Sequence, residues 1–236
     1  KLMKLDQLLK NQEEFMGSLA HEMKTPLTSI IGYADLMRIE NLSEEEQKEA
    51  CGYIYSEGKR LQNLSLKLMN LLVLKNQEFQ MKKQNLVPMI HEVISSMQYR
   101  LQEQEILVNL NLKPTICEVE ADLLKSLILN LVDNSLKSMN VGGILTIECC
   151  PAQEGAKIYV SDTGCGMPKG ELDKITEAFY RVDKSRSRKQ GGVGLGLALC
   201  KEIVRIHKGD MEFISQEEKG TTAIITIGGG HYEETD

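Results

Sequence analysis

The sequence predicts two domains, a helical hairpin followed by an α/β domain. Apolar residues recur at helical spacing from Leu5 to about Glu40, and again over a second segment that fades near Asn76. After the polar segment 75–85, stretches of alternating apolar and polar residues occur between further helical stretches. The 236 residues are enough for two small domains, at about 100 to 200 residues per domain. The expected divisions are residues 1–78, residues 79–228 and a disordered tail at 229–236.

The first domain is predicted to be two amphipathic helices joined by a short loop. Ser43, followed three residues later by Glu46, is a capping-box pattern that starts the second helix. Because the connection is short, the helices are expected to lie antiparallel. Such a hairpin leaves an apolar stripe uncovered, so we expect a homodimer in which two hairpins form a four-helix bundle. The apolar positions are Phe15, Leu19, Met23, Leu27, Ile30, Ala34 and Met37, then Ala50, Tyr53, Ile54, Leu61, Leu64, Leu68, Leu71 and Leu72.

The second domain is predicted to alternate strands with helices. This alternation indicates a layered α/β architecture rather than a second helical bundle. Gly209 is expected to stop the last helix. The expected strands are 106–112, 144–150, 157–162, 211–215 and 221–227, and the expected helices are 120–139 and 197–207.

Composition argues against several functions. The chain has 28 Lys and Arg against 34 Asp and Glu, and this formal charge of -6 argues against nonspecific binding of nucleic acid. With no Trp and 5% aromatic residues, base or sugar stacking is disfavoured. The six cysteines show no C-x-x-C spacing, which favours reduced thiols over a zinc site or disulfides. No segment reaches the about 18 apolar residues of a membrane-spanning helix, so this part of the chain is expected to be soluble and free of membrane contact.

His21 lies in mid-helix, in the segment His-Glu-Met-Lys-Thr-Pro. Most helical histidines are structural, and Glu22 taken alone would be a solvated charge. Pro26, however, lacks the amide that would bond the carbonyl of Glu22, and its ring crowds the same turn. A disturbed turn beside a histidine and a carboxylate indicates a nucleophile with a partner that can orient it or accept its proton.

Asn130, Asn134 and Lys137 are spaced i, i+4 and i+7, so they share one face of the helix expected at 120–139. A polar helix face is usually only solvated, but asparagine is a poor helix former. Amide oxygens can bind Mg²⁺, and Lys137 one turn further on could bind a phosphate chain. The spacing alone leaves both interpretations open.

Asp162 ends a predicted strand and begins the segment Asp-Thr-Gly-Cys-Gly-Met. Gly164 and Gly166 permit backbone conformations that other residues avoid, and they allow a ligand to approach the chain closely. An aspartate at a strand end can accept a hydrogen bond from an exocyclic amine. The alternative is a tight turn with an aspartate cap, and the segment alone does not decide between them.

Gly192, Gly194 and Gly196 lie immediately before the helix expected at 197–207. A glycine-rich loop that leads into a helix N-terminus favours anions, because free amides and the helix dipole both attract them. The pattern is neither a Walker A loop nor a dinucleotide fingerprint. The segment 181–189 carries five basic residues and one Asp, and beside such a loop it is interpreted as a lid that meets polyphosphate rather than as a solvated loop.

Four blocks in order, 21–26, 130–137, 162–167 and 191–196, closely resemble the catalytic core of bacterial two-component sensor histidine kinases. They match the family's H box, N box and two glycine boxes, and Phe179-Tyr180-Arg181 resembles its F box. The resemblance covers nearly the whole chain. It implies a dimeric helical-hairpin domain that carries the phosphorylated histidine, followed by an ATP-binding α/β sandwich of the Bergerat (GHKL) type. It also implies an ATP-dependent protein-histidine kinase.

The resemblance assigns catalytic roles. His21 would attack the γ-phosphate of ATP, and Glu22 would serve as general base. Arg181 would steady charge on the transferred phosphoryl group, in a reaction that depends mainly on positioning and electrostatics. The phosphoryl group would then pass to an aspartate on the receiver domain of a response regulator. Thr25 matches the position associated with the reverse, phosphatase activity.

The resemblance also assigns the contacts to ATP and Mg²⁺. Asn130 would hold Mg²⁺, Asn134 and Lys137 would contact phosphates, and Asp162 would recognise the adenine amine. Many family members carry an aromatic residue at the position of Ser138, where it stacks on adenine, so the expectation here is weaker affinity or stacking by Tyr180. The other residues implied to contact the nucleotide are Gly164, Gly166, Gly192, Gly194, Gly196 and Thr222.

Family members generally carry an N-terminal input domain. The chain is therefore expected to be the cytoplasmic core of a longer protein tethered to the bacterial cell membrane. Two other functions fit the sequence less well. A gyrase-like or Hsp90-like ATPase resembles this chain less, because those enzymes carry a glutamate base where this chain has Asn130, and they lack the His21 helix. A non-enzymatic dimeric scaffold is disfavoured because the nucleophile and the phosphate-contacting residues are all present.

Overall fold

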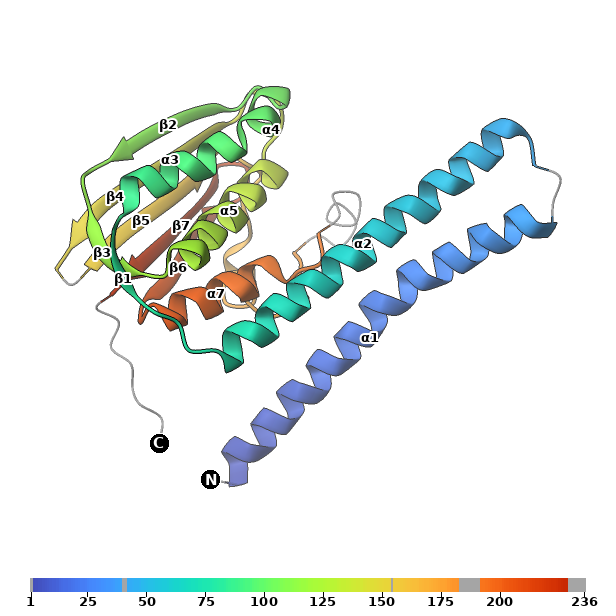
Figure 1. The fold of residues 1–236 in the computed structure, drawn as a ribbon, viewed down its shortest axis with the longest axis horizontal. Helices are drawn as coiled ribbons and strands as arrows, with labels where there is room; N and C mark the ends of the chain where they lie inside the picture. Colours follow the sequence, from blue (N-terminus) through green and yellow to red (C-terminus); the bar gives the residue numbers. More distant parts are fainter. Residues whose placement is uncertain (1, 40–41, 154, 183–191, 229–236) are drawn as a thin grey trace.

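The computed structural model describes residues 2–39, 42–153, 155–182 and 192–228. It confirms a helical hairpin followed by an α/β domain (Figure 1). Helices α1 (Leu2–Ile39) and α2 (Glu44–Asn76) form the hairpin, which projects from the α/β domain (Figure 1). The five residues 77–81 join α2 to the first strand without helix or strand structure of their own. None of the helices in the described ranges is both long and apolar enough to span a membrane.

The predicted capping box at the start of α2 is confirmed. The backbone N–H of Ser43 donates to the Glu46 carboxylate at 2.9 Å, and the backbone N–H of Glu46 donates to the Ser43 hydroxyl at 3.4 Å. Two donors that the helix start leaves unpaired are thereby satisfied. In α1 the helix continues through Pro26, whose side chain is buried.

The α/β domain contains two sheets. In the larger sheet the strand order is β2-β4-β5-β7-β6, with β2 and β4 parallel and the other pairs antiparallel. The smaller sheet pairs β1 with β3. The elements, in chain order, are β1 (Lys82–Asn85), α3 (Leu86–Ser96), α4 (Gln98–Glu103), β2 (Leu107–Leu112), β3 (Ile116–Val119), α5 (Ala121–Ser138), β4 (Ile144–Ala152), β5 (Gly155–Asp162), the 3₁₀ helix η1 (Lys169–Glu171), α7 (Gly196–Ile206), β6 (Asp210–Gln216) and β7 (Gly220–Ile227).

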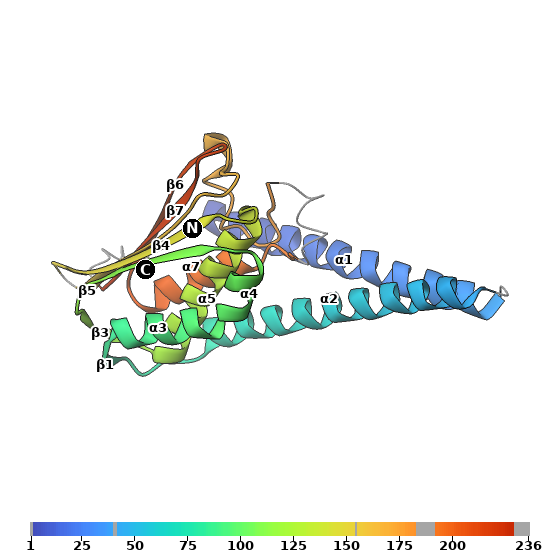
Figure 2. The ribbon, with the colours of Figure 1, turned by 90° about the horizontal axis from the view of Figure 1, so that it is seen from above.

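Helices α3, α5 and α7 cover one face of the large sheet (Figure 2). The strands alternate buried and exposed side chains, as expected for a sheet covered on one face. The largest fully buried side chains come from both layers and include Leu124, Leu127, Ile128, Ile147, Ile158 and Ile203. Leu64, Leu71 and Leu74 of α2 are buried in the same apolar cluster, so the hairpin and the α/β domain share a continuous core.

The strands and helices predicted from residue 106 onward are confirmed, with ends that differ by a few residues. The prediction missed α3, α4 and the small sheet. Strand β1 is polar and mostly exposed, so it resembles a linker in sequence, and its structure depends on backbone pairing with β3. The predicted lid at 181–189 lies outside the described residues from 183 onward, and the predicted tail at 229–236 lies wholly outside them.

Candidate active site

A cavity of about 820 Å³ opens beside α5, α7 and the end of β5. Its volume is within the range of about 300–1,000 Å³ that is typical of small-molecule sites. Nine of the residues predicted to form the site line it: Asn134, Lys137, Asp162, Gly166, Tyr180, Arg181, Gly192, Gly194 and Gly196. Separate sequence blocks therefore meet at one cavity.

Asp162 lies at one end of this cavity, surrounded by donors. Its Oδ1 accepts from the backbone N–H of Gly164 at 2.9 Å, the Ser138 hydroxyl at 3.1 Å and the backbone N–H of Thr221 at 3.3 Å. Its Oδ2 accepts from the Ser135 hydroxyl at 2.9 Å. Burial raises the pKa of Asp162 although these donors oppose the shift. The result is a fixed, partly buried acceptor that faces the cavity.

Two glycines near Asp162 are required by close packing. Gly166 has a φ of +63°, and a Cβ there would lie 1.9 Å from the carbonyl oxygen of Gln216. A Cβ at Gly164 would lie 2.1 Å from the Ser138 hydroxyl. Thr222, which was predicted to contact nucleotide, does not line the cavity, and its hydroxyl pairs with that of Ser161 at 2.9 Å. The neighbouring Thr221 does line it.

Asn134 and Lys137 line another part of the wall, where α5 meets the start of α7. Lys137 forms an ion pair of 2.6 Å with Asp133, which also pairs with Arg100 at 2.6 Å. Burial alone would raise the pKa of Asp133, but the two cations hold it below its ordinary value. Lys137 is thus positioned beside the glycine-rich segment by a carboxylate that stays charged.

Asn130 is adjacent to this wall. A Cβ built on Gly196 would lie 3.3 Å from the Asn130 amide oxygen, and the Asn130 amide nitrogen donates to Ser126 at 2.8 Å. The amide oxygen therefore faces the first turn of α7. Among the described residues, no group of three His, Cys, Asp or Glu could hold a metal ion. An amide oxygen together with ligand phosphates is a donor set that suits Mg²⁺, so the site fits this ion.

The segment between η1 and α7 connects the cavity to the hairpin. Phe179 has a φ of +67°, and its backbone N–H donates to the carbonyl of Gly194 at 2.8 Å. Its ring packs on Phe15 of α1, with ring centroids 5.3 Å apart. The hydroxyl of Tyr180 donates to Glu171. The side chains after Phe179 are thus held between η1, the glycine-rich segment and α1.

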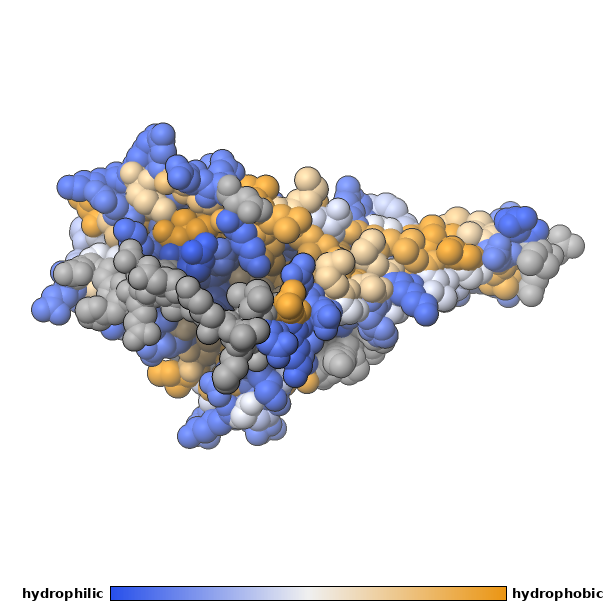
Figure 3. Space-filling view, turned by 90° about the horizontal axis from the view of Figure 1, so that it is seen from below, coloured by the Kyte–Doolittle hydropathy of each residue, from blue (hydrophilic) through white to orange (hydrophobic). Residues whose placement is uncertain are grey.

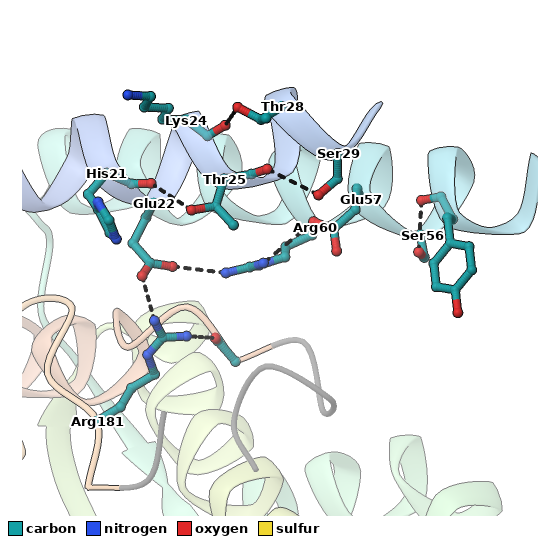
Figure 4. Close-up of polar contacts among 12 residues, drawn as sticks. His21, Glu22, Lys24, Thr25, Thr28, Ser29, Ser56, Glu57, Arg60 and Arg181 are labelled. Carbon is teal, nitrogen blue, oxygen red and sulfur yellow. Dashed lines mark hydrogen bonds and ion pairs between the residues drawn. The ribbon is translucent and has the colours of Figure 1, made fainter. Parts of the chain in front are cut away.

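Glu22 of α1 is buried between two arginines (Figure 4). Its Oε2 pairs with Arg60 of α2 at 3.0 Å, and its Oε1 pairs with Arg181 at 2.5 Å. Arg181 also donates to the carbonyl of Gly192 at 2.9 Å and lines the cavity. One arginine therefore links the cavity wall to the carboxylate beside His21.

His21 is exposed on α1, and Figure 4 shows its ring beside Glu22, on the side of α1 that faces the α/β domain. The Thr25 hydroxyl donates to the backbone carbonyl of His21 at 3.3 Å. His21, Glu22 and Thr25 thus lie close together on α1. Arg181, which pairs with Glu22, connects this group to the edge of the cavity.

The sequence did not single out several residues that shape the site. Ser135 orients Asp162, but in sequence it looks like an ordinary helix residue, and the contact of Ser138 with Asp162 was not predicted either. Arg60 pairs with Glu22 within the hairpin, whereas the contact of Phe15 with Phe179 depends on how the two domains dock. Only Ser138 carried a signal, because it replaces an aromatic residue common in the resembling family.

An exposed helical histidine docked beside a glycine-flanked cavity in an α/β domain defines the class of two-domain histidine kinase cores. Residues 11–71 match the His Kinase A (phospho-acceptor) domain. Residues 119–229 match the histidine kinase-, DNA gyrase B-, and HSP90-like ATPase family. Both matches agree with the geometry, and the chain belongs to the sensor histidine kinase family.

The chain is 32% identical to the sensor histidine kinase WalK of Bacillus subtilis, over 95% of this chain and 37% of the relative. It is 29% identical to the sensor protein SrrB of Staphylococcus aureus, over 94% of this chain and 38% of the relative. The chain thus spans less than two fifths of the length of these curated relatives. A solved structure of histidine kinase ThkA in complex with response regulator protein TrrA has the same fold, with a TM-score of 0.75 and 22% identity over 95% of this chain and 66% of that one.

Proposed function

We propose that this chain autophosphorylates His21 from ATP and passes the phosphoryl group to an aspartate of a response regulator. The observation that carries the proposal is the contact of Arg181 with both the cavity wall and Glu22. This contact supports the proposal because it connects Glu22, the neighbour of His21, to the wall of a cavity whose volume would suit a nucleotide. Family membership supports the reaction class.

In the proposed complex, adenine lies at Asp162 and the phosphates lie toward Asn134 and Lys137. Asp162 would accept a hydrogen bond from the adenine amine, because a carboxylate is an acceptor. The donors that surround it hold this acceptor in a fixed orientation. The N-terminus of α7 favours the anionic phosphates. Asn130 would hold Mg²⁺, which would neutralise part of the phosphate charge.

The ion pairs of Glu22 suggest how the reaction is controlled. Both carboxylate oxygens are engaged in the structure, so Glu22 could not readily accept the ring proton of His21 while both arginines remain. The γ-phosphate offers Arg181 a second anion, and transfer of Arg181 to that phosphate would release one oxygen of Glu22. The imidazole nitrogen would then bond to phosphorus as the bond to ADP breaks, and its proton would pass to Glu22.

The hairpin is proposed to form a homodimer. Figure 3 shows apolar surface along the projecting hairpin. Large apolar side chains remain exposed on both helices, including Met16, Met23, Leu27 and Ile31 of α1 and Leu66, Met69, Leu72 and Val73 of α2. A second hairpin would cover them, as expected for a bundle.

The response regulator is the proposed phosphoryl acceptor, and the ThkA complex with TrrA is the related example. We also propose that Thr25 orients a water in the reverse, phosphatase reaction, since it lies one helical turn from His21. The full-length protein is proposed to be tethered to the bacterial cell membrane. These proposals follow from the family and from the position of the residues.

The proposal is tested by incubating the protein with γ-labelled ATP and Mg²⁺, with His21→Ala in parallel. We expect label that is labile in acid, stable in base and missing from His21→Ala, because a phosphoramidate has that stability. Release of free phosphate without protein label would instead support an ATPase. Label that survives acid, or that persists in His21→Ala, would refute His21 as the acceptor.

A further inference from the structure

A lysine of the hairpin lies in the wall of the cavity. Lys67 belongs to α2, yet it lines the same cavity as Asn134, Lys137 and Gly196 of the α/β domain. The neighbouring Leu64 and Leu71 of α2 are 3% and 8% exposed and belong to the core that both domains share. The packing of these leucines therefore holds Lys67 at the cavity, and its side chain does not have to reach across solvent.

The positive charge of Lys67 is not neutralised within the described part of the chain, where its ammonium group has no hydrogen bond or ion pair. The two neighbouring cations are different, since Lys137 pairs with Asp133 and Arg181 pairs with Glu22. Both oxygens of Asp133 are already engaged, by Lys137 and by Arg100. Asp133, the carboxylate that favours the charged form of Lys67, is thus already paired with other cations.

The electrostatic surroundings disfavour the charged form of Lys67. Burial lowers its pKa, nearby Lys137 lowers it further, and Asp133 and Cys200 only partly oppose this shift. Two ammonium groups beside one cavity repel each other, and an anion placed between them would relieve that repulsion. A triphosphate carries several negative charges, so it would favour the charged form of both lysines.

We propose that Lys67 of the hairpin binds the polyphosphate of the nucleotide while the α/β domain is docked on α2. This inference rests on the proposed function, since it adds a contact to the same nucleotide. The helical domain then supplies part of the ATP site as well as the phosphorylated histidine. By linkage, bound ATP stabilises the docked arrangement by the same factor by which docking strengthens ATP binding.

The test is calorimetric titration of the whole chain, in the presence of Mg²⁺, with ATP and with AMP. Lys67→Met keeps the length of the side chain and removes its charge. We expect it to weaken ATP binding about tenfold and to leave AMP binding within about twofold, because a charge-assisted contact to the outer phosphates is lost. Lys67→Arg should retain most of the ATP affinity. The matched control is Lys75→Met, an exposed lysine of the same helix.

The possible outcomes separate the explanations. Equal ATP affinity in Lys67→Met and wild type would overturn the inference while leaving the proposed function intact. An equal loss of ATP and AMP affinity would also overturn it, since that pattern indicates damage to packing rather than a lost phosphate contact. If the wild-type protein bound no ATP, the proposed function would fail and the inference would fall with it.

Discussion

The carboxylate of Glu22 is shared by two arginines from different parts of the chain, Arg60 of α2 and Arg181 beside the cavity. All three side chains are at most 10% exposed, so water screens these ion pairs weakly. If Arg181 moves to the γ-phosphate, Arg60 remains to hold Glu22 in place. Arg60 is therefore expected to be a positioning residue that touches neither nucleotide nor histidine in the reaction.

Arg60→Met should lower the initial rate of His21 phosphorylation about tenfold, because a displaced base loses alignment with the imidazole. ATP affinity should stay within about twofold, since the residue lies outside the cavity. Initial label incorporation and titration with ATP measure the two quantities. Arg38→Met, which removes an exposed pair with Asp35 on α1, is the control. An unchanged rate would contradict the positioning role.

Ser138 shows how one residue can be interpreted differently in sequence and in structure. Its small side chain removes an aromatic surface, which led to the expectation of weaker nucleotide binding. In the structure its hydroxyl packs closely against Gly164 and shares its proton between the Ser135 carbonyl, at 2.8 Å, and Asp162, at 3.1 Å. Ser138 thus contributes to the acceptor that faces the cavity. The sequence showed that the aromatic ring is missing at position 138, but it could not show the hydrogen bond between Ser138 and Asp162.

At the level of elements, periodicity was sufficient for α5 but not for the shorter α3, which also buries an apolar face. Helix α5 carries Leu124, Leu127 and Leu131 toward the sheet, and its ends follow the predicted span closely. The polar strand β1 has no such pattern, and its pairing with β3 links residues far apart in sequence. The contact between Glu22 and Arg181 joins residues 159 positions apart. Contacts of this kind depend on domain docking, which leaves no local periodicity.

His207 joins two helices of the α/β domain and provides a test at this scale. Its Nδ1 lies 2.8 Å from the carbonyl of Ile203, and its Nε2 accepts from the backbone N–H of Glu120 at 3.0 Å. The second bond requires an unprotonated Nε2. Burial lowers the pKa of His207 although the neighbouring backbone groups and Glu120 oppose the shift. The end of α7 is thus fastened to the start of α5 by a neutral imidazole.

The sign of the pH effect follows from this shift. Below the ordinary histidine pKa of about 6.5, the unfolded chain binds a proton that the folded chain resists, so stability falls as the pH falls. We expect His207 to account for part of the stability lost between pH 7.5 and 5.5, up to about 1.4 kcal/mol, the limit set by proton binding to the unfolded chain. Urea unfolding at both pH values measures it. His207→Gln should show a smaller loss than wild type, whereas His91→Gln, at an exposed histidine, should not.

At the level of the whole molecule, the apolar surface of the hairpin predicts a dimer. Ile31 on α1 and Met69 on α2 are 58% and 60% exposed in the single hairpin. Exposed apolar surface of this kind marks an interaction site. Light scattering at micromolar concentration should give twice the mass of 26.5 kDa. Ile31→Glu together with Met69→Glu should give a monomer that still binds ATP, because neither residue lines the cavity. A monomeric wild-type protein would refute the bundle.

The five residues between α2 and β1 have a consequence for kinetics. Fully extended, a segment of that length spans about 17 Å, at about 3.4 Å per residue. Such a short tether holds the nucleotide domain near the hairpin at an effective concentration on the order of millimolar. Each docking contact can therefore be weak, and the domain can release and return rapidly. In the proposed reaction, ATP bound to this domain would therefore meet His21 in a first-order step, whose rate is independent of protein dilution as long as the proposed dimer persists.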